Sequence, residues 1–193
     1  MGKFSVDPAF GLRSTVAIAG GTTSSGSGQD AAAILLQAIL GQMANQQGST
    51  AAGAPATVYS KVRFGNPFKI EVEFGSLVAG GRIAFGPIVG TDVLGGHRLF
   101  YVSGSQPAIQ FVALKKGEQA MLATHLLGKS LEDRKRHILT WTRQASGAMA
   151  VSLDGAKLFT VTDQIFRDPF SGLAITNPGG DFVIRRAVVD VAG

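Results

Sequence analysis

The chain has 193 residues, of which 45% are hydrophobic, so it can bury the core of one ordinary domain. The absence of cysteine excludes disulfide bonds, a thiol nucleophile and a zinc site with thiolate ligands. The net charge of +5 is too small for the dense basic stripe of a nucleic-acid-binding protein, and no apolar stretch is long enough for a membrane-spanning helix.

The N-terminal residues, MGKFSVDPAFGL, contain no apolar core of the length found in secretory signals. A mature exported protein would begin in the same way, so the compartment is not identified, and export is the interpretation that we favour. Residues 12–19, LRSTVAIA, have the composition of a short strand. The segment that follows, GGTTSSGSGQ, is typical of a flexible polar loop.

An amphipathic helix is predicted over residues 30–47, where apolar side chains recur at i, i+3, i+4, i+7, i+8 and i+11. These side chains are Ala32, Leu35, Leu36, Ile39, Leu40 and Met43. Because no charge follows Asp30 within the helix, we expect it to cover one end or face of the fold. The alternative is docking onto a second copy or another protein. We therefore divide the chain into an N-terminal extension, 1–55, and a main domain, 56–193.

From Thr57 onward the hydrophobic period changes from helical to two, and turn compositions such as FGNP, LGG and NPGG recur. The predicted strands span residues 57–62, 68–74, 82–89, 98–103, 108–115, 120–126, 137–143, 148–154, 157–162, 173–176 and 182–191. In FKIEVEF, apolar residues alternate with Lys69, Glu71 and Glu73, which predicts one buried and one solvated face. The whole pattern is typical of packed antiparallel sheets.

The C-terminal part of this pattern resembles a known family. Residues 136–191 contain a strand with Trp141, a hairpin partner that ends in Leu153-Asp154-Gly155, and a final strand after NPGG. In these elements the chain resembles the concanavalin A-like lectin and glucanase superfamily, in particular its laminin-G-like jelly rolls. The resemblance implies an all-β fold, a two-sheet antiparallel jelly-roll sandwich, to which we add one N-terminal α-helix.

The resemblance also implies a concave sheet face that binds glycans or proteins and, in some branches, cleaves glycans. The laminarinase-like branch has carboxylates in the order Glu, Asp, Glu on one strand. Here only Glu71 and Glu73 share a face, and the third acid is absent. We therefore predict a non-catalytic, lectin-like module for a carbohydrate. The alternatives are a structural, assembly or adhesion protein that uses the sandwich as a scaffold, and a glycoside hydrolase that uses both glutamates.

A glycan site needs an aromatic platform beside planar hydrogen-bonding groups. The candidate ligand-binding residues are His97, Arg98, Tyr101, Gln110, Trp141 and Arg143. If the sheet order follows the jelly-roll pattern, some of them meet on the concave face. For Trp141, the sole tryptophan, burial in the core is the interpretation that we favour.

Metal and acyl-transfer sites receive little support, because none of the histidines has an acid or a second histidine at metal-ligand spacing and no G-x-S-x-G motif occurs. The histidines are His97, His125 and His137. Calcium would need oxygen ligands from separate loops, and the available ones are Asp92, Asp154, Asp163, Asp168 and Asn177. We predict no cofactor, and a turn-forming role for Asp154 and Asn177.

The densest basic segment lies between residues 129 and 137 and contains Lys129, Arg134, Lys135, Arg136 and His137. Such a segment is usually a solvated loop with local ion pairs. The alternative is contact with an acidic glycan, for which affinity falls steeply as salt rises.

Overall fold

The computed structural model describes residues 3–8, 11–17, 55–91, 95–115, 118–167 and 169–191. Strands are the regular elements in these ranges: β1 (Lys3–Asp7), β2 (Gly11–Val16), β3 (Ala56–Ser60), β4 (Phe68–Ser76), β5 (Arg82–Ile88), β6 (Gly96–Val102), β7 (Ala108–Lys115), β8 (Glu118–Leu126), β9 (His137–Arg143), β10 (Ala148–Leu153), β11 (Ala156–Thr162) and β12 (Gly172–Asp190). In this part of the chain no helix has the length and hydropathy to cross a membrane. The helix predicted over residues 30–47 lies outside the described residues and stays a prediction.

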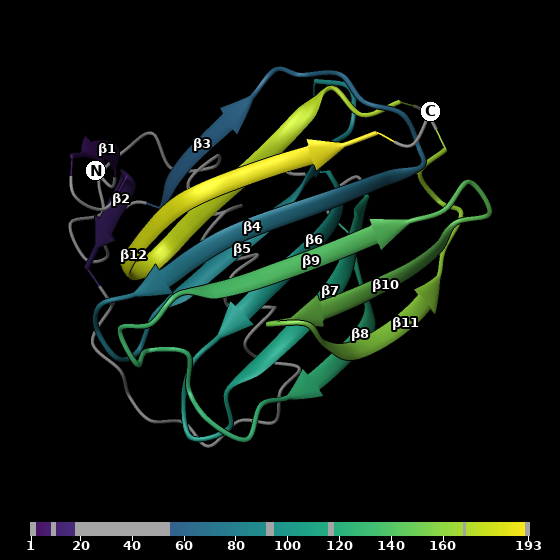
Figure 1. The fold of residues 1–193 in the computed structure, drawn as a ribbon. Coiled ribbons are helices and arrows are strands. Elements are labelled where there is room, and N and C mark those ends of the chain that lie inside the picture. The colour runs from purple at the N-terminus through teal and green to yellow at the C-terminus, as the bar shows by residue number, and fades with distance from the viewer. Residues whose placement is uncertain are drawn as a thin grey trace.

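The strands form two antiparallel sheets that pack face to face (Figure 1). The sheet nearer the viewer in Figure 1, here called the front sheet, has the order β1-β2-β12-β4-β9-β10-β11. The other, the back sheet, has the order β3-β12-β5-β6-β7-β8. The predicted all-β, two-sheet antiparallel sandwich is therefore confirmed.

The core lies between the sheets and is built from alternate residues of the strands. In β4 the inward side chains are at most 3% exposed, as the alternation predicted: Phe68, Ile70, Val72 and Phe74. Across the core they face apolar side chains of the back sheet, among them Ile83, Phe85, Leu99, Ile109 and Phe111. Removing this apolar surface from water is the main favourable term in the stability of the sandwich.

Strand β12 belongs to both sheets. Its residues 172–179 pair with β3 and β5 in the back sheet, and residues 180–190 pair with β2 and β4 in the front sheet. The prediction of two strands, 173–176 and 182–191, with a turn between them was wrong, because the chain bends at NPGG and continues as one strand. The other predicted main-domain strands agree with the structure to within two residues at each end.

The buried side chain of Asn177 holds the bend in β12. Its amide nitrogen donates to the backbone carbonyls of Ser14 (3.0 Å) and Gly180 (3.1 Å), and its oxygen accepts from the Gly179 N–H (3.0 Å). These bonds replace ladder bonds that Pro178, which lacks an N–H, cannot make. Asn177 therefore holds a bend within one strand, where a turn between two strands was predicted.

Gly180→Ala is expected to lower the free energy of unfolding by about 2 kcal/mol or more. Gly180 has a φ of +116°, and an added Cβ would lie 2.7 Å from Cα of Gly81 in the adjacent chain segment. Urea denaturation followed by circular dichroism measures the change. Gly128→Ala is the control, because a Cβ there meets nothing within 4 Å. Equal losses in the two variants would contradict this account of the bend.

The N-terminal residues extend the front sheet through a hairpin of β1 and β2. Strand β1 was not predicted, and β2 begins and ends earlier than the predicted 12–19. Arg13 of β2 donates to both carboxylate oxygens of Asp181 in β12, from Nε (3.0 Å) and from Nη2 (2.6 Å). These hydrogen bonds raise the pKa of Arg13. The bidentate pair sets the position of β2 against β12.

Candidate functional site

The six residues nominated from the sequence are all buried, and they do not share one face. Four point into the core: His97, Tyr101, Trp141 and Arg143. The other two, Arg98 and Gln110, lie on the opposite side of the back sheet. Neighbours in a strand point to opposite faces, so His97 and Arg98 of β6 cannot belong to one platform. The expected aromatic and amide platform is therefore not formed by this set.

His97 is the centre of a buried polar cluster. Its Nε2 lies 2.9 Å from Oδ2 of Asp163, and its Nδ1 lies 3.4 Å from Nη1 of Arg143. Because a guanidinium only donates, this hydrogen-bond pattern assigns the proton to Nε2 and leaves Nδ1 as an acceptor. The rings of Phe111 and Phe166 pack on the imidazole, with centroid distances of 5.4 and 4.8 Å.

Burial lowers the pKa of His97 to about 4, although the carboxylate of Asp163 acts in the opposite direction. The ring is therefore neutral at neutral pH, in agreement with its hydrogen bonds. A neutral histidine beside an aspartate resembles the base and orienting acid of a hydrolase triad. Here the side chain of His97 is 0% exposed and both ring nitrogens have partners, so the pair supports the fold.

Arg143 connects the front sheet to the loop before β12. Its Nε donates to Oδ1 of Asn66 (2.6 Å), and its Nη2 donates to the backbone carbonyls of Asp163 (3.1 Å) and Phe166 (2.8 Å). Burial lowers the pKa of the guanidinium, which nevertheless stays charged because arginine is protonated throughout the range in which proteins fold. The side chain thus satisfies acceptors on three residues from two separate loops.

The two aromatic candidates also have structural positions. Trp141 packs edge to face against Phe68 and Phe111, with centroid distances of 5.2 and 5.1 Å, which confirms the favoured interpretation that it is a core residue. The hydroxyl of Tyr101 accepts from the backbone N–H of Leu131 (3.1 Å), a buried residue of the loop before β9. Burial raises the pKa of this tyrosine.

Arg98 and Gln110 lie beside a second apolar cluster on the outer face of the back sheet. We call it the outer cluster, and its residues are Ala84, Phe100, Val112 and Leu114. Nη1 of Arg98 donates to the backbone carbonyls of His97 (2.8 Å) and Pro87, so the guanidinium lies along its own sheet. Because the outer cluster occupies its centre, the outer face of the back sheet is largely apolar there, and the residues of the cluster are buried.

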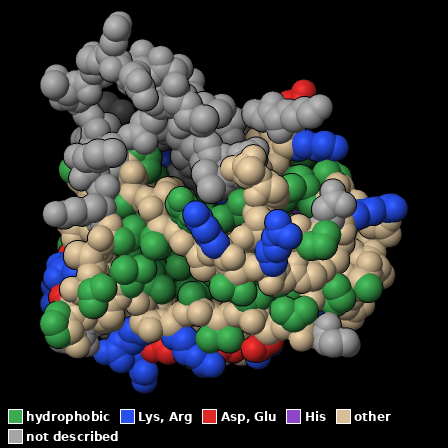
Figure 2. All heavy atoms as spheres, turned by 90° about the horizontal axis from the view of Figure 1, so that it is seen from above, with side chains coloured by type: hydrophobic (Ala, Val, Ile, Leu, Met, Phe, Trp, Pro, Cys, Tyr) green, Lys and Arg blue, Asp and Glu red, His purple; other side chains and the backbone are tan. Residues whose placement is uncertain are grey.

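The outer face of the front sheet is solvated and charged. Glu71 pairs with Lys69 (3.2 Å) and Arg186 (3.1 Å), and Glu73 pairs with Arg136 (3.1 Å). Figure 2 shows basic and acidic side chains together along the lower edge of the molecule, which is the front-sheet side of Figure 1. The two glutamates considered for glycan cleavage do share this face, and both are bonded to basic side chains.

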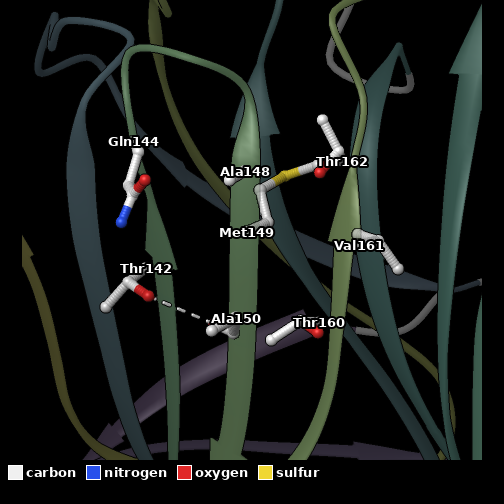
Figure 3. Close-up of a pocket in the computed structure, with 8 residues that line it drawn as sticks. All are labelled: Thr142, Gln144, Ala148, Met149, Ala150, Thr160, Val161 and Thr162. Carbon is white, nitrogen blue, oxygen red and sulfur yellow. Dashed lines mark hydrogen bonds between the residues drawn. The ribbon is translucent and has the colours of Figure 1, made fainter.

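The front sheet is hollowed beside this charged stripe, over β9, β10 and β11 (Figure 3). The hollow has a volume of about 380 Å³ and is lined by Thr142, Gln144, Ala148, Met149, Ala150, Thr160, Val161 and Thr162. Ala150 of β10 lies in register between Thr142 and Thr160, so a methyl group occupies the centre where larger side chains flank it. Lys69 is the next residue in this row, so the charged stripe borders the hollow.

Sequence reasoning missed the hollow because it has no motif. The outward positions of TWTRQ, AMAVS and FTVT carry small, hydroxyl or amide side chains, which alternate with inward ones. Once the two hairpins pair these three segments, their outward positions form one small-residue surface. A search for aromatic and charged residues could not find it.

The basic segment before β9 is a loop, as predicted, and Arg134, Lys135 and Arg136 are exposed in it. His137, at the start of β9, is buried and its ring nitrogens lie 3.0 Å from Asp133 and 2.8 Å from Asp154. Burial alone would raise the pKa of the Asp133 carboxyl, but hydrogen bonds from the Lys135 N–H and the His137 ring hold it below its ordinary value.

The oxygen ligands considered for calcium have other partners where the structure describes them. Asp154 has a φ of 51° in the turn between β10 and β11, and its carboxylate accepts from the Ile138 N–H (2.8 Å), so its predicted turn-forming role is confirmed. Asp163 and Asn177 bond to His97 and to the β12 bend. The remaining two, Asp92 and Asp168, lie outside the described residues.

No model of a known protein family matches this sequence, and neither does any curated protein. Solved structures share its fold. The carbohydrate-binding module CBM66 from Bacillus subtilis is 13% identical, with a TM-score of 0.60 over 70% of this chain and 81% of that one. The carbohydrate recognition domain of Emp47p is 13% identical, with a TM-score of 0.59 over 77% and 87%. A glycoside hydrolase family 16 endo-glucanase from Bacteroides ovatus is 14% identical, with a TM-score of 0.53 over 72% and 75%.

These likenesses are at the level of the fold. The chain has the jelly-roll fold of these proteins, so the predicted resemblance is confirmed at the level of the fold. Because carbohydrate-binding proteins and an endo-glucanase share this fold, the activity has to be argued from the surface of this chain.

Proposed function

We propose that this chain is a non-catalytic carbohydrate-binding module and that the hollow over β9, β10 and β11 is its binding site. The main support is the fold, which the chain shares with a carbohydrate-binding module and a carbohydrate recognition domain. The support for the location is that the hollow is an open, partly polar depression on paired strands. Sites on strands are positioned more rigidly than sites on loops.

The lining suits a sugar in its hydrogen-bonding chemistry. The hydroxyls of Thr142, Thr160 and Thr162 both donate and accept, as sugar hydroxyls do, and Gln144 adds an amide. Lys69, in register with Thr142, can add a charge-assisted bond to an acidic sugar. None of the described residues that line the hollow is aromatic, so we expect weak binding, with a Kd on the order of 1 mM.

Glycan cleavage is not part of this proposal. Retaining glycosidases place two carboxyl groups about 5 Å apart on either side of the scissile bond, one acting as acid and one as nucleophile. Glu71 and Glu73 are bonded to Lys69, Arg186 and Arg136 instead, and neither lines the hollow. Turnover of a β-glucan that is lost in Glu71→Gln would overturn this part of the proposal.

Ala150→Tyr is expected to weaken glycan binding roughly tenfold or more, because the phenol ring fills the centre of the hollow. A glycan array with the full chain identifies candidate ligands, and calorimetry or NMR titration of the best one gives the Kd. The matched control is Ile138→Tyr, which adds the same ring on the outward side of β9 at a residue that does not line the hollow.

The two variants separate the outcomes. A loss confined to Ala150→Tyr supports the hollow, whereas an equal loss in Ile138→Tyr places binding elsewhere on the front sheet. An array without hits argues against carbohydrate binding altogether. The titration is repeated at rising salt, where an acidic glycan loses affinity steeply and a neutral one does not. It is also repeated with EDTA, which we expect to leave the Kd unchanged because we propose no metal.

A structural or assembly role is the second candidate. Strand β3 is an edge of the back sheet, and Tyr59 in it and Val62 just after it are 50% and 63% exposed. An apolar edge strand is a template for pairing with another chain. A stable oligomer in sedimentation velocity, together with an array without hits, would favour this role over carbohydrate binding.

A further inference from the structure

The outward side chains of β10 are small along the whole strand. They are Ala148, Ala150 and Ser152. Figure 3 shows the two alanines in a column along β10, with side chains of β9 on one side and of β11 on the other. Outward residues of one strand follow each other at roughly 7 Å, so the three positions cover roughly 14 Å. This length exceeds a single sugar and suits a chain of sugars that lies along the strand.

The neighbours of Ser152 add polar groups at one end of this column. Ser152 is in register with Thr140 of β9 and Lys157 of β11. Residues in register point to the same face of a sheet, so a hydroxyl lies on one side of Ser152 and an ammonium group on the other. A shift of register after Val151 places Lys157, and not Leu158, opposite Ser152. Leu158 packs against the core, whereas Lys157 is exposed.

A second exposed cation lies at the other end of the column. The turn between β9 and β10 contains Ser146, two residues before Ala148. Gln164 donates from Nε2 to the backbone carbonyl of Ser146 (3.0 Å), and Arg167 donates from Nη2 to Oε1 of Gln164 (2.6 Å). The exposed side chain of Arg167 is therefore held near this turn.

The carboxylates at the two ends already have partners for both oxygens. Asp163, which follows Thr162, accepts from the Ile165 N–H (2.8 Å), and its other oxygen lies 2.9 Å from Nε2 of His97. Asp154, which follows β10, accepts from the Ile138 N–H and bonds to the ring of His137, both at 2.8 Å. A ligand along β10 therefore meets a cation at each end, and these carboxylates are engaged elsewhere.

We infer that the ligand of the hollow is the interior of a linear glycan with anionic groups, which lies along β10 between Lys157 and Arg167. This inference rests on the proposed function of the hollow. The alanines leave room for the sugar rings, the hydroxyls of Thr140 and Ser152 extend the hydrogen-bonding surface, and the two cations bind the anionic groups. Ammonium and guanidinium groups bind carboxylate and sulfate alike, so the test uses a probe of each kind.

The test is a calorimetric or NMR titration of the full chain with dimers and hexamers from polygalacturonate and from chondroitin sulfate, and with neutral cellohexaose. We expect the hexamer of at least one anionic series to bind roughly tenfold more tightly than its dimer and than cellohexaose. Lys157→Gln combined with Arg167→Gln is expected to weaken hexamer binding roughly tenfold and to leave dimer binding unchanged. Ser152→Tyr is expected to bring the Kd of the hexamer close to that of the dimer, because the ring blocks the column.

The matched control combines Lys115→Gln on β7 with Arg185→Gln on β12, which removes the same charge from exposed positions away from the column and is expected to change no Kd. Equal affinity for dimer and hexamer, equal affinity for cellohexaose, or an equal loss in the control would overturn the inference. Ala150→Tyr separates these results from a failure of the proposed function. If it abolishes binding while chain length and charge have no effect, the hollow is the site and only the linear anionic ligand is wrong. If no probe binds, or if Ala150→Tyr changes nothing, neither proposal holds for these glycans.

Discussion

The free energy of unfolding is expected to fall by about 3 kcal/mol between pH 7 and pH 4 through His97 alone. The pKa of His97 is lowered to about 4 in the folded chain and is 6.5 in its ordinary state. Between these values the unfolded chain binds a proton that the folded chain does not. The contribution of His97 to the free energy of unfolding is therefore complete above pH 6.5. It is lost as the pH falls towards 4, and it changes little below that.

The measurement is urea denaturation at a series of pH values for the full chain and for His97→Gln. Glutamine keeps a donor towards Asp163 but does not titrate, so the variant is expected to lose this part of the pH dependence while being less stable at pH 7. His125→Gln, on strand β8, is the control for replacing a histidine outside this buried cluster. A His97→Gln curve parallel to the parent's would show that His97 is not the group responsible.

Arg143→Met is expected to lower the free energy of unfolding by about 3 to 5 kcal/mol. Methionine fills similar space but leaves the acceptors on Asn66, Asp163 and Phe166 without their donor in a buried site. Because two of these acceptors belong to the loop between β11 and β12, we also expect faster amide hydrogen exchange in residues 163–167.

The control is Arg186→Met on the outer face of the front sheet. Arg186 also pairs with a carboxylate, but its side chain is 60% exposed, and such pairs contribute about 0 to 1 kcal/mol. Arg143→Lys keeps the charge and loses the planar fork, so an intermediate loss is expected. A loss in Arg143→Met no larger than in Arg186→Met would mean that the loop is held by its apolar contacts alone.

The two faces of the sandwich differ in a way that bears on function. The front sheet presents ion pairs and a hollow with hydroxyl groups, whereas the outer face of the back sheet is apolar and closed. A ligand from solvent therefore meets the front sheet first.

Much of the fold follows from local pattern. Alternation in β4 predicted which side chains point inward, and the aspartate-glycine pair at Asp154 predicted the hairpin of β10 and β11. These features depend on near neighbours in the chain, because strand geometry fixes the direction of each side chain relative to the next.

The candidate site could not be obtained in this way. His97 and Arg143 have polar side chains that are usual at surfaces, and their burial depends on Asp163 and Phe166, which lie at least 20 residues away in the chain. The hollow likewise exists only where three strands pair in register around Ala150. NPGG has the composition of a turn, yet β12 crosses it, because both sheets supply partners on either side of the bend.

By itself, then, the order of residues determined the strands, their inward faces and the tight turns, since these need only contacts between neighbours and the removal of apolar side chains from water. The tertiary structure decided which polar groups are buried and which surface stays open. Those outcomes depend on partners from distant parts of the chain, and a buried charge or amide is stable only where such partners converge.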